Sequence, residues 1–249
     1  MKTIILAAGM GIRLRPLTEY IPKPFINIDG KTLIIRSLDN INDMGLKEVV
    51  IVIGYLRDMF KKKIGNSYKN LKITYVYSQN YSNTGSMYSL SKTEGIIEDE
   101  ILLLEGDLLY EKKALKYLIN SKEPNEILVA PLSGSGDEVY ICVNESNELT
   151  NLGKNIINKR EAIGELVGIS KLSSEFLSSL YEMAKEDYKR EKNLYHYEEV
   201  IFKLSKTHPI KCKLIQDLNW IEIDNENDLR RANNKVYPKI INNERNFNN

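Results

Sequence analysis

A short apolar run followed by a Gly-Met-Gly loop stands near the start of the chain: Ile4-Ile5-Leu6-Ala7-Ala8-Gly9-Met10-Gly11. An uninterrupted apolar run of this length is typical of a strand that is buried on both faces of a parallel sheet. In open α/β sheets ligands bind at the carboxyl ends of the strands, and glycines let backbone N–H groups approach a phosphate closely. The segment therefore predicts an α/β fold with a phosphate-binding loop after its first strand.

Similar apolar runs alternate with helical patterns through the first half of the chain. Further strands are expected at 49–53, 73–77, 101–104 and 127–130, and helices at 33–44, 56–64, 86–97 and 113–120. The second half adds an expected hairpin at 138–143 and 148–151, strands at 165–170, 210–215 and 220–224, and helices at 173–191, 195–205 and 225–236. The alternation predicts a doubly wound, mixed, mostly parallel sheet with a small α+β insertion in its second half.

Composition excludes several classes of protein. The 249 residues are long enough to bury a core without a stabilising metal, and 35 Lys and Arg against 34 Asp and Glu give a formal net charge of +1. Such a balance does not suggest a nucleic-acid partner, and no apolar run reaches the roughly 18 residues that span a bilayer. Cys142 and Cys212 match no metal or redox spacing, so we expect buried thiols in a cytoplasmic protein without membrane insertion. The sequence leaves open whether the protein forms a homo-oligomer.

Two cationic side chains accompany the glycine loop. Arg13 follows Gly11 by two residues and can make a planar, bidentate contact with a phosphate. Lys23 stands between Pro22 and Pro24, which fix the local backbone and limit where its ammonium can point. The third glycine of a dinucleotide fingerprint and the Gly-Lys-Ser/Thr ending of a P-loop are both missing. The loop and its two cations predict a triphosphate cradle, although a lysine between prolines is also common in ordinary surface loops.

The whole segment from Leu6 to Phe25 resembles the signature of the sugar nucleotidyltransferase superfamily, Leu-Ala-Ala-Gly-x-Gly-x-Arg-Leu followed by Pro-Leu-Thr and Pro-Lys-Pro. The resemblance implies a Rossmann-like nucleotidyltransferase fold in which Arg13 and Lys23 neutralise phosphates as catalytic residues and two acidic residues hold Mg²⁺. It also implies that the nucleoside triphosphate is bound by the residues of the loop, namely Leu6, Ala7, Ala8, Gly9 and Gly11.

Asp107 and Asp224 are the candidate Mg²⁺ ligands. Asp107 directly follows a buried strand and a glycine, so its carboxylate is expected at the same sheet edge as the glycine loop. Strand alternation in 220–224 places Trp220, Glu222 and Asp224 on one face. Carboxylates at a phosphate site suit a hard, oxygen-seeking cation. For Asp224 a helix N-cap is an equally simple explanation.

An uncharged polar loop leads into the helix expected at 86–97. Its candidate nucleoside contacts are Gln79, Thr84, Gly85 and Ser86. Amide side chains and a helix N-terminus can hydrogen-bond a pyrimidine edge and a ribose, and the resemblance implies that this region contacts the nucleoside. A capped loop without ligand contacts is the alternative.

Within the superfamily, the Tyr-Ser-Leu at 88–90 and the Trp-x-Glu-Ile-Asp at 220–224 resemble the cytidylyltransferases that act on phosphocholine or 2-aminoethylphosphonate. The cationic head of such an acceptor is best held by aromatic faces beside a carboxylate. We therefore expect an acceptor box of Tyr197, Glu198, Trp220 and Tyr140, with a solvated helix face as the alternative for the tyrosines.

These features predict a Mg²⁺-dependent transfer of CMP from CTP to a small phosphorylated or phosphonate amine, with release of pyrophosphate. A sugar-1-phosphate nucleotidyltransferase using UTP or dTTP and an inactive nucleotide-binding regulatory subunit are the alternatives. The domain is expected over 1–236, with a nucleotide-binding half at 1–132 and an acceptor-binding half at 133–236. Residues 237–249 are expected to form a flexible tail, which is Asn-rich from residue 242.

Overall fold

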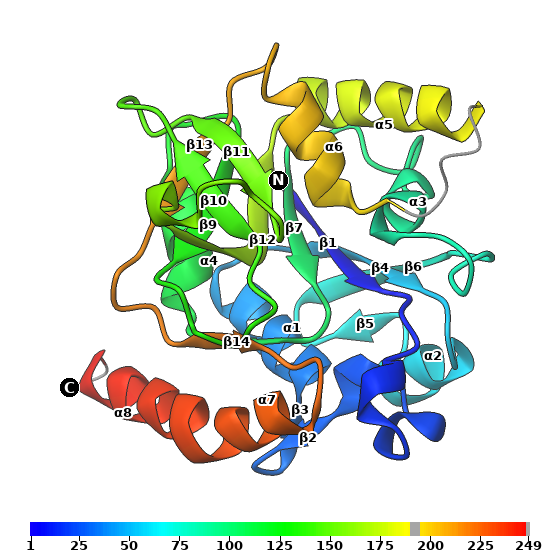
Figure 1. Ribbon diagram of the computed structural model, residues 1–249. Helices are drawn as coiled ribbons and strands as arrows, with labels where there is room; N and C mark the ends of the chain where they lie inside the picture. The colour runs from blue at the N-terminus through cyan, green and yellow to red at the C-terminus, as the bar shows by residue number, and fades with distance from the viewer. Residues whose placement is uncertain (190–194, 248–249) are drawn as a thin grey trace.

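One mixed sheet forms the centre of the computed structural model, which describes residues 1–189 and 195–247 (Figure 1). Its strands are β1 (Lys2–Ala7), β4 (Glu48–Ile53), β5 (Ser67–Tyr68), β6 (Leu71–Tyr77), β7 (Ile101–Glu105), β9 (Glu126–Ala130), β10 (Tyr140–Val143), β11 (Leu149–Gly153), β12 (Gly164–Leu172) and β13 (Lys211–Leu214). The neighbours β6, β4, β1 and β7 run parallel, and the antiparallel β12 joins β7 to the second half of the chain. The predicted fold class is confirmed.

Helices cover both faces of this sheet. They are α1 (Leu33–Asp43), α2 (Asp58–Ile64), α3 (Ser86–Ser91), α4 (Lys113–Asn120), α5 (Ser174–Lys189), α6 (Tyr197–Leu204), α7 (Glu226–Arg231) and α8 (Tyr237–Phe247). Because successive side chains of a strand point to opposite faces, Ile4 packs in the apolar cluster that contains α3, α5 and α6, while Ile5 packs in the one that contains α1, α2 and α4. This two-sided burial explains the uninterrupted apolar sequence of β1.

Several predicted helices differ in extent from those of the structure. The helix expected at 86–97 is the shorter α3, and the one expected at 225–236 is α7 followed by a π-helix over Ala232–Val236. The helix expected at 173–191 is α5, with residues 190 and 191 outside the described ranges. The buried, free thiols of Cys142 and Cys212 agree with the expectation. None of the helices within residues 1–189 and 195–247 has the length and apolar character that a bilayer crossing requires.

A separate two-stranded ladder brings two acidic segments together. The strands β8 (Leu108–Tyr110) and β14 (Trp220–Glu222) pair antiparallel, with Glu222 opposite Leu108. The ladder continues into a backbone hydrogen bond of 3.2 Å from the Ile223 N–H to the Asp107 carbonyl. Residues that are more than a hundred positions apart in the sequence are therefore held side by side at the end of β7.

The flexible tail expected from residue 237 is instead helix α8. Its Ile240 is only 4% exposed and packs in an apolar cluster with residues of α1, β8 and β14. The Asn243 side chain donates a hydrogen bond of 2.6 Å to Glu111, and the Tyr237 hydroxyl donates one of 2.8 Å to Asp29. The prediction of a tail rested on the polar, Asn-rich composition and overlooked two apolar positions, 237 and 240, that share one helix face.

Glu165 on β12 gives a testable pH dependence of stability. Its carboxylate is 3% exposed and accepts hydrogen bonds from the Ser133 N–H at 2.7 Å and from the Ser133 hydroxyl at 3.3 Å. Burial raises the pKa of Glu165 to about 7. As the pH rises from about 4.5 to 7, the unfolded chain ionises first, so the folded state loses stability, by about 3 kcal/mol in total.

We therefore expect Glu165→Gln to gain stability over the wild type as the pH is raised from 4 to 8. Urea unfolding at both pH values measures the difference in the free energy of unfolding. The exposed Glu175→Gln serves as the control and should follow the wild type. A Glu165→Gln advantage that stays constant between pH 4 and 8 would contradict the raised pKa.

Candidate active site

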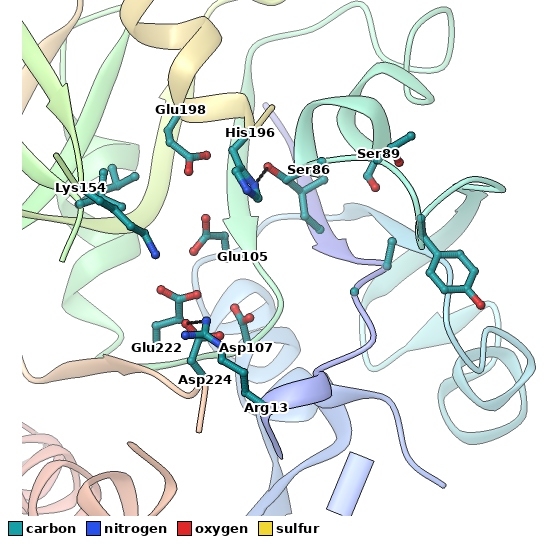
Figure 2. Close-up of a pocket in the computed structure, with 18 residues that line it drawn as sticks. Arg13, Ser86, Ser89, Glu105, Asp107, Lys154, His196, Glu198, Glu222 and Asp224 are labelled. Atoms are coloured by element: carbon teal, nitrogen blue, oxygen red, sulfur yellow. Dashed lines mark hydrogen bonds and ion pairs between the residues drawn. The ribbon is translucent and has the colours of Figure 1, made fainter. Parts of the chain in front are cut away.

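A cavity of about 400 Å³ opens at the carboxyl ends of β1 and β7 (Figure 2). It is walled by segments from both halves of the chain: the loop after β1, the start of α3, the end of β7, the region of Lys154, the start of α6 and the segment after β14. Ten of the residues predicted for the site line it: Leu6, Ala8, Gly9, Arg13, Thr84, Gly85, Ser86, Asp107, Glu198 and Asp224.

The glycine loop folds back on the segment that carries Lys23. Gly11 has φ of +60°, and a Cβ atom there would lie 3.2 Å from Thr18 Cγ2 and 3.3 Å from Lys23 Cβ. The Thr18 hydroxyl donates a hydrogen bond of 2.6 Å to the Gly11 carbonyl. Glycine is suited to this position because the left-handed backbone and the close approach both disfavour a side chain.

Lys23 is the centre of an ion-pair network. Its ammonium lies 2.5 Å from Asp107 Oδ2 and 2.5 Å from Asp224 Oδ1, and the residue is only 8% exposed. Burial lowers the pKa of Lys23, but the attraction of Asp107 and Asp224 outweighs it and raises the pKa above the ordinary value. Arg13 completes the network through contacts of 2.8 Å to Asp224 and 2.9 Å to Asp137. The tertiary structure thus brings the two predicted cations and the two predicted metal ligands together.

Carboxylates outnumber cations in the cavity wall. Arg13 and Lys154 are the only Lys or Arg residues among the described residues that line it, against five carboxylates: Glu105, Asp107, Glu198, Glu222 and Asp224. Burial and then the neighbouring charge of Asp107 raise the pKa of Glu105 to about 8. Burial also raises the pKa of Glu198, and burial with the charges of Glu105 and Asp107 raises that of Glu222. A bound cation would relieve this repulsion.

The arrangement of three of these carboxylates fits a divalent cation. Glu105, Asp107 and Glu222 each offer an oxygen, and these oxygens lie within 4.8 Å of one another. Asp107 Oδ1 is buried and has no hydrogen-bond partner. Oxygen donors of this kind are the ligands that Mg²⁺ prefers. The sequence prediction did not include Glu105 or Glu222 as ligands, although each stands two residues before a predicted ligand at the end of a strand.

Three predicted acceptor residues do not form the expected aromatic box. The Tyr197 ring is buried and its hydroxyl donates a hydrogen bond of 2.9 Å to Glu105, while Lys159 lies 4.5 Å from the ring centre of Tyr140. Trp220 lines a smaller neighbouring pocket. Tyr81 is the only Phe, Tyr or Trp among the described residues of the main cavity. The box is not assembled because the tertiary structure directs these rings to the core or to other surfaces.

Other predicted nucleotide contacts lie beside the cavity. The side chain of Ala7 packs in the apolar cluster of α1, α2 and α4, and Gln79 is exposed outside the cavity lining. Lys154 and His196, which the sequence prediction left out, both line the cavity. No motif marks them, because their positions depend on how the second half folds over the first.

The start of α6 rests directly on the start of α3. A Cβ atom at Gly85 would lie 2.0 Å from the Tyr195 carbonyl oxygen, so only glycine allows this approach. The Tyr197 N–H donates a hydrogen bond of 3.1 Å to the Ser86 hydroxyl. The two halves of the chain therefore meet at the loop that was predicted to bind the nucleoside.

Comparison with known proteins finds related sequences and structures. The sequence model of the nucleotidyl transferase family matches residues 2–140 of this chain. The chain is 25% identical to a CMP-5'-(3-aminopropyl)phosphonate synthase of Streptomyces rubellomurinus, over 96% of this chain and 39% of that protein. It is 27% identical to a CTP:phosphoglutamine cytidylyltransferase of Campylobacter jejuni, over 92% of this chain and 98% of that one. The inositol-1-phosphate CTP transferase from T. maritima shares the fold, with a TM-score of 0.81 at 24% identity over 96% and 94% of the two chains.

Proposed function

Because the chain belongs to the nucleotidyl transferase family, we propose that it transfers CMP from CTP to a small phosphonate or phosphate ester that carries a primary ammonium. The main support is the cavity, in which the glycine loop and Arg13 lie beside a wall of surplus carboxylates, two of which pair with Lys23. Two relatives that match more than nine-tenths of this chain are named for CMP or CTP chemistry on phosphorylated or phosphonate acceptors.

In the proposed reaction an acceptor oxygen attacks the α-phosphorus of CTP in line. A P–O bond forms between them, the bond from the α-phosphorus to the bridging oxygen of the β-phosphate breaks, and pyrophosphate leaves. The acceptor oxygen is already ionised near neutral pH, so no general base is needed. Arg13 and Lys23 lower the barrier by reducing the repulsion between two anions and by stabilising charge on the transferring group.

Mg²⁺ is the proposed metal. Asp107 and Glu222, which belong to the carboxylate cluster, would hold it together with Asp224, the second ligand expected from the sequence. When bound, the ion supplies charge neutralisation at the transferring phosphoryl group. The ammonium of Lys23 lies between Asp107 and Asp224, so it keeps these carboxylates paired when no metal is bound.

The lining of the cavity favours a primary ammonium over a trimethylammonium group. A quaternary ammonium has no N–H to donate and is best held by aromatic faces, whereas a primary ammonium donates three hydrogen bonds. The wall offers the carboxylates of Glu105 and Glu198, which face a common space in Figure 2, and Tyr81 as its aromatic residue. An aminoalkylphosphonate therefore fits this wall better than phosphocholine.

Pyrophosphate release with a panel of substrates tests the proposal. We expect the highest rate with CTP and 2-aminoethylphosphonate or 3-aminopropylphosphonate, and a kcat/KM at least about tenfold lower with phosphocholine, which corresponds to 1.4 kcal/mol. UTP, dTTP and ATP, each with glucose 1-phosphate, provide the contrasting pairs. A higher rate with dTTP or UTP and the sugar phosphate would overturn the assignment.

A further inference from the structure

His196 lies where the nucleotide side and the acceptor side of the cavity meet. It directly precedes α6, its ring lies between Ser86 and Glu198 in Figure 2, and it is exposed to the cavity. The same side chain also lines a groove that continues from the cavity past Lys154 and Glu198. The proposed transfer of CMP assigns no role to His196.

The hydrogen bonds of Ser86 bear on which imidazole nitrogen of His196 carries the proton. The Ser86 hydroxyl oxygen already accepts the Tyr197 N–H at 3.1 Å, and it lies 3.2 Å from His196 Nδ1. A hydroxyl that accepts one hydrogen bond still has its own proton to donate. If this proton goes to Nδ1, then the neutral imidazole carries its N–H on Nε2, which leaves that nitrogen as a donor for a ligand.

We propose that His196 donates this Nε2–H to an anionic oxygen of the acceptor and, with Lys154, holds the acceptor phosphonate or phosphate in place. Only Arg13, Lys154 and His196 bring side-chain N–H donors to the cavity lining within the described residues. Arg13 belongs to the triphosphate loop and pairs with Asp137 and Asp224. Lys154 and His196 come from the second half of the chain and share the groove with Glu198.

The hydrogen-bonding groups of Lys154, His196 and Glu198 match the two ends of the proposed acceptor. Lys154 and His196 offer donors for its anionic group, and the carboxylate of Glu198 accepts from its ammonium. Lys154 already pairs with Asp137 at 2.5 Å. Among the described residues, no carboxylate forms such a pair with the His196 ring, so its Nε2–H is the donor that an acceptor can use without breaking an ion pair. This inference rests on the proposed function, because it takes the acceptor to be a phosphonate or phosphate with an ammonium.

Three substitutions of His196 test the roles of its two ring nitrogens separately. The amide of His196→Asn can reach the position of Nδ1 and keep the Ser86 contact, while the longer His196→Gln places its amide nitrogen near the position of Nε2. His196→Ala removes both. Binding of 2-aminoethylphosphonate is measured by calorimetry in the presence of Mg²⁺ and α,β-methylene-CTP, and KM and kcat are measured with CTP.

We expect His196→Asn and His196→Ala to weaken acceptor binding and raise acceptor KM about 10- to 100-fold, as for the loss of a hydrogen bond to a charged group. His196→Gln is expected to stay within about threefold of the wild type, and the KM for CTP within about twofold in all three. The inference alone is overturned if His196→Gln is impaired as much as His196→Ala, or if His196→Asn behaves as the wild type. A wild-type protein that binds CTP but no aminoalkylphosphonate overturns both the inference and the proposed function.

Discussion

Replacing Lys23 by methionine is expected to lower kcat at least about a hundredfold, because the variant loses the ammonium that lies between Asp107 and Asp224. A positioned cation at a developing negative charge contributes several kcal/mol to a reaction barrier, and each 1.36 kcal/mol is a factor of ten in rate. Methionine has a similar length, so it fills the same space without the charge. Steady-state pyrophosphate release with saturating CTP and 2-aminoethylphosphonate measures the effect.

The same variant gives a second, independent prediction, which concerns its stabilisation by Mg²⁺. Without the ammonium, the carboxylates of Asp107 and Asp224 lose their shared partner, and a buried charge without a partner is destabilising. Mg²⁺ should therefore raise the thermal midpoint of Lys23→Met more than that of the wild type. Lys31→Met, which removes a surface ion pair with Asp39, is the matched control and should change neither kcat nor the Mg²⁺ response. A Lys23→Met kcat within tenfold of the wild type would refute the role of Lys23.

Asp107→Asn is expected to lower kcat by about two to three orders of magnitude at saturating substrates. Asp107 contacts Lys23 through one oxygen, and its other oxygen is buried and unpaired beside Glu105 and Glu222. The amide keeps the shape of the side chain but removes the charge that Mg²⁺ needs, and a metal of this kind stabilises the transition state by several kcal/mol. The control is Asp217→Asn, which changes an exposed carboxylate paired with Lys113 and should leave kcat unchanged.

Glu222→Gln tests whether the metal site includes the carboxylate that the sequence did not assign. We expect this variant to need at least about tenfold more Mg²⁺ for half-maximal rate, which corresponds to 1.4 kcal/mol of lost binding. The readout is the rate as a function of Mg²⁺ concentration for the wild type, Glu222→Gln and Asp107→Asn. Unchanged Mg²⁺ dependence in Glu222→Gln would leave Asp107 and Asp224 as the proposed ligands.

The phosphate end of the site could be predicted because its chemistry lies in short, contiguous segments. Gly11, Arg13 and Lys23 fall within fifteen residues, and the constraints of glycine and proline on the backbone are local. Asp107 follows a strand of the central sheet, and strand ends of a doubly wound sheet meet at one edge. Asp224 follows β14 of the separate ladder, so its place near Asp107 was expected from the family resemblance and not from a local rule.

The acceptor end could not be predicted in the same way. Tyr197 and Tyr140 were expected to face a ligand, yet Tyr197 is buried against Glu105 and Tyr140 lies under Lys159. Lys154 and His196, which do line the cavity, come from a turn after β11 and the residue before α6. The direction of these two side chains depends on how the second half of the chain packs over the first. A pattern of a few residues in the sequence does not predict that packing.

The amino-acid sequence by itself determined the parallel strands, the glycine loop and the pair of cations near it, because strand burial and backbone conformation follow from neighbouring residues. Only the tertiary structure decided that Lys23 lies between Asp107 and Asp224, that Glu105 and Glu222 join Asp107, and that α8 is a helix packed through Ile240. The contact between Lys23 and Asp224 joins residues 201 positions apart, so its free energy exists only after the chain has folded and the carboxylates are buried together.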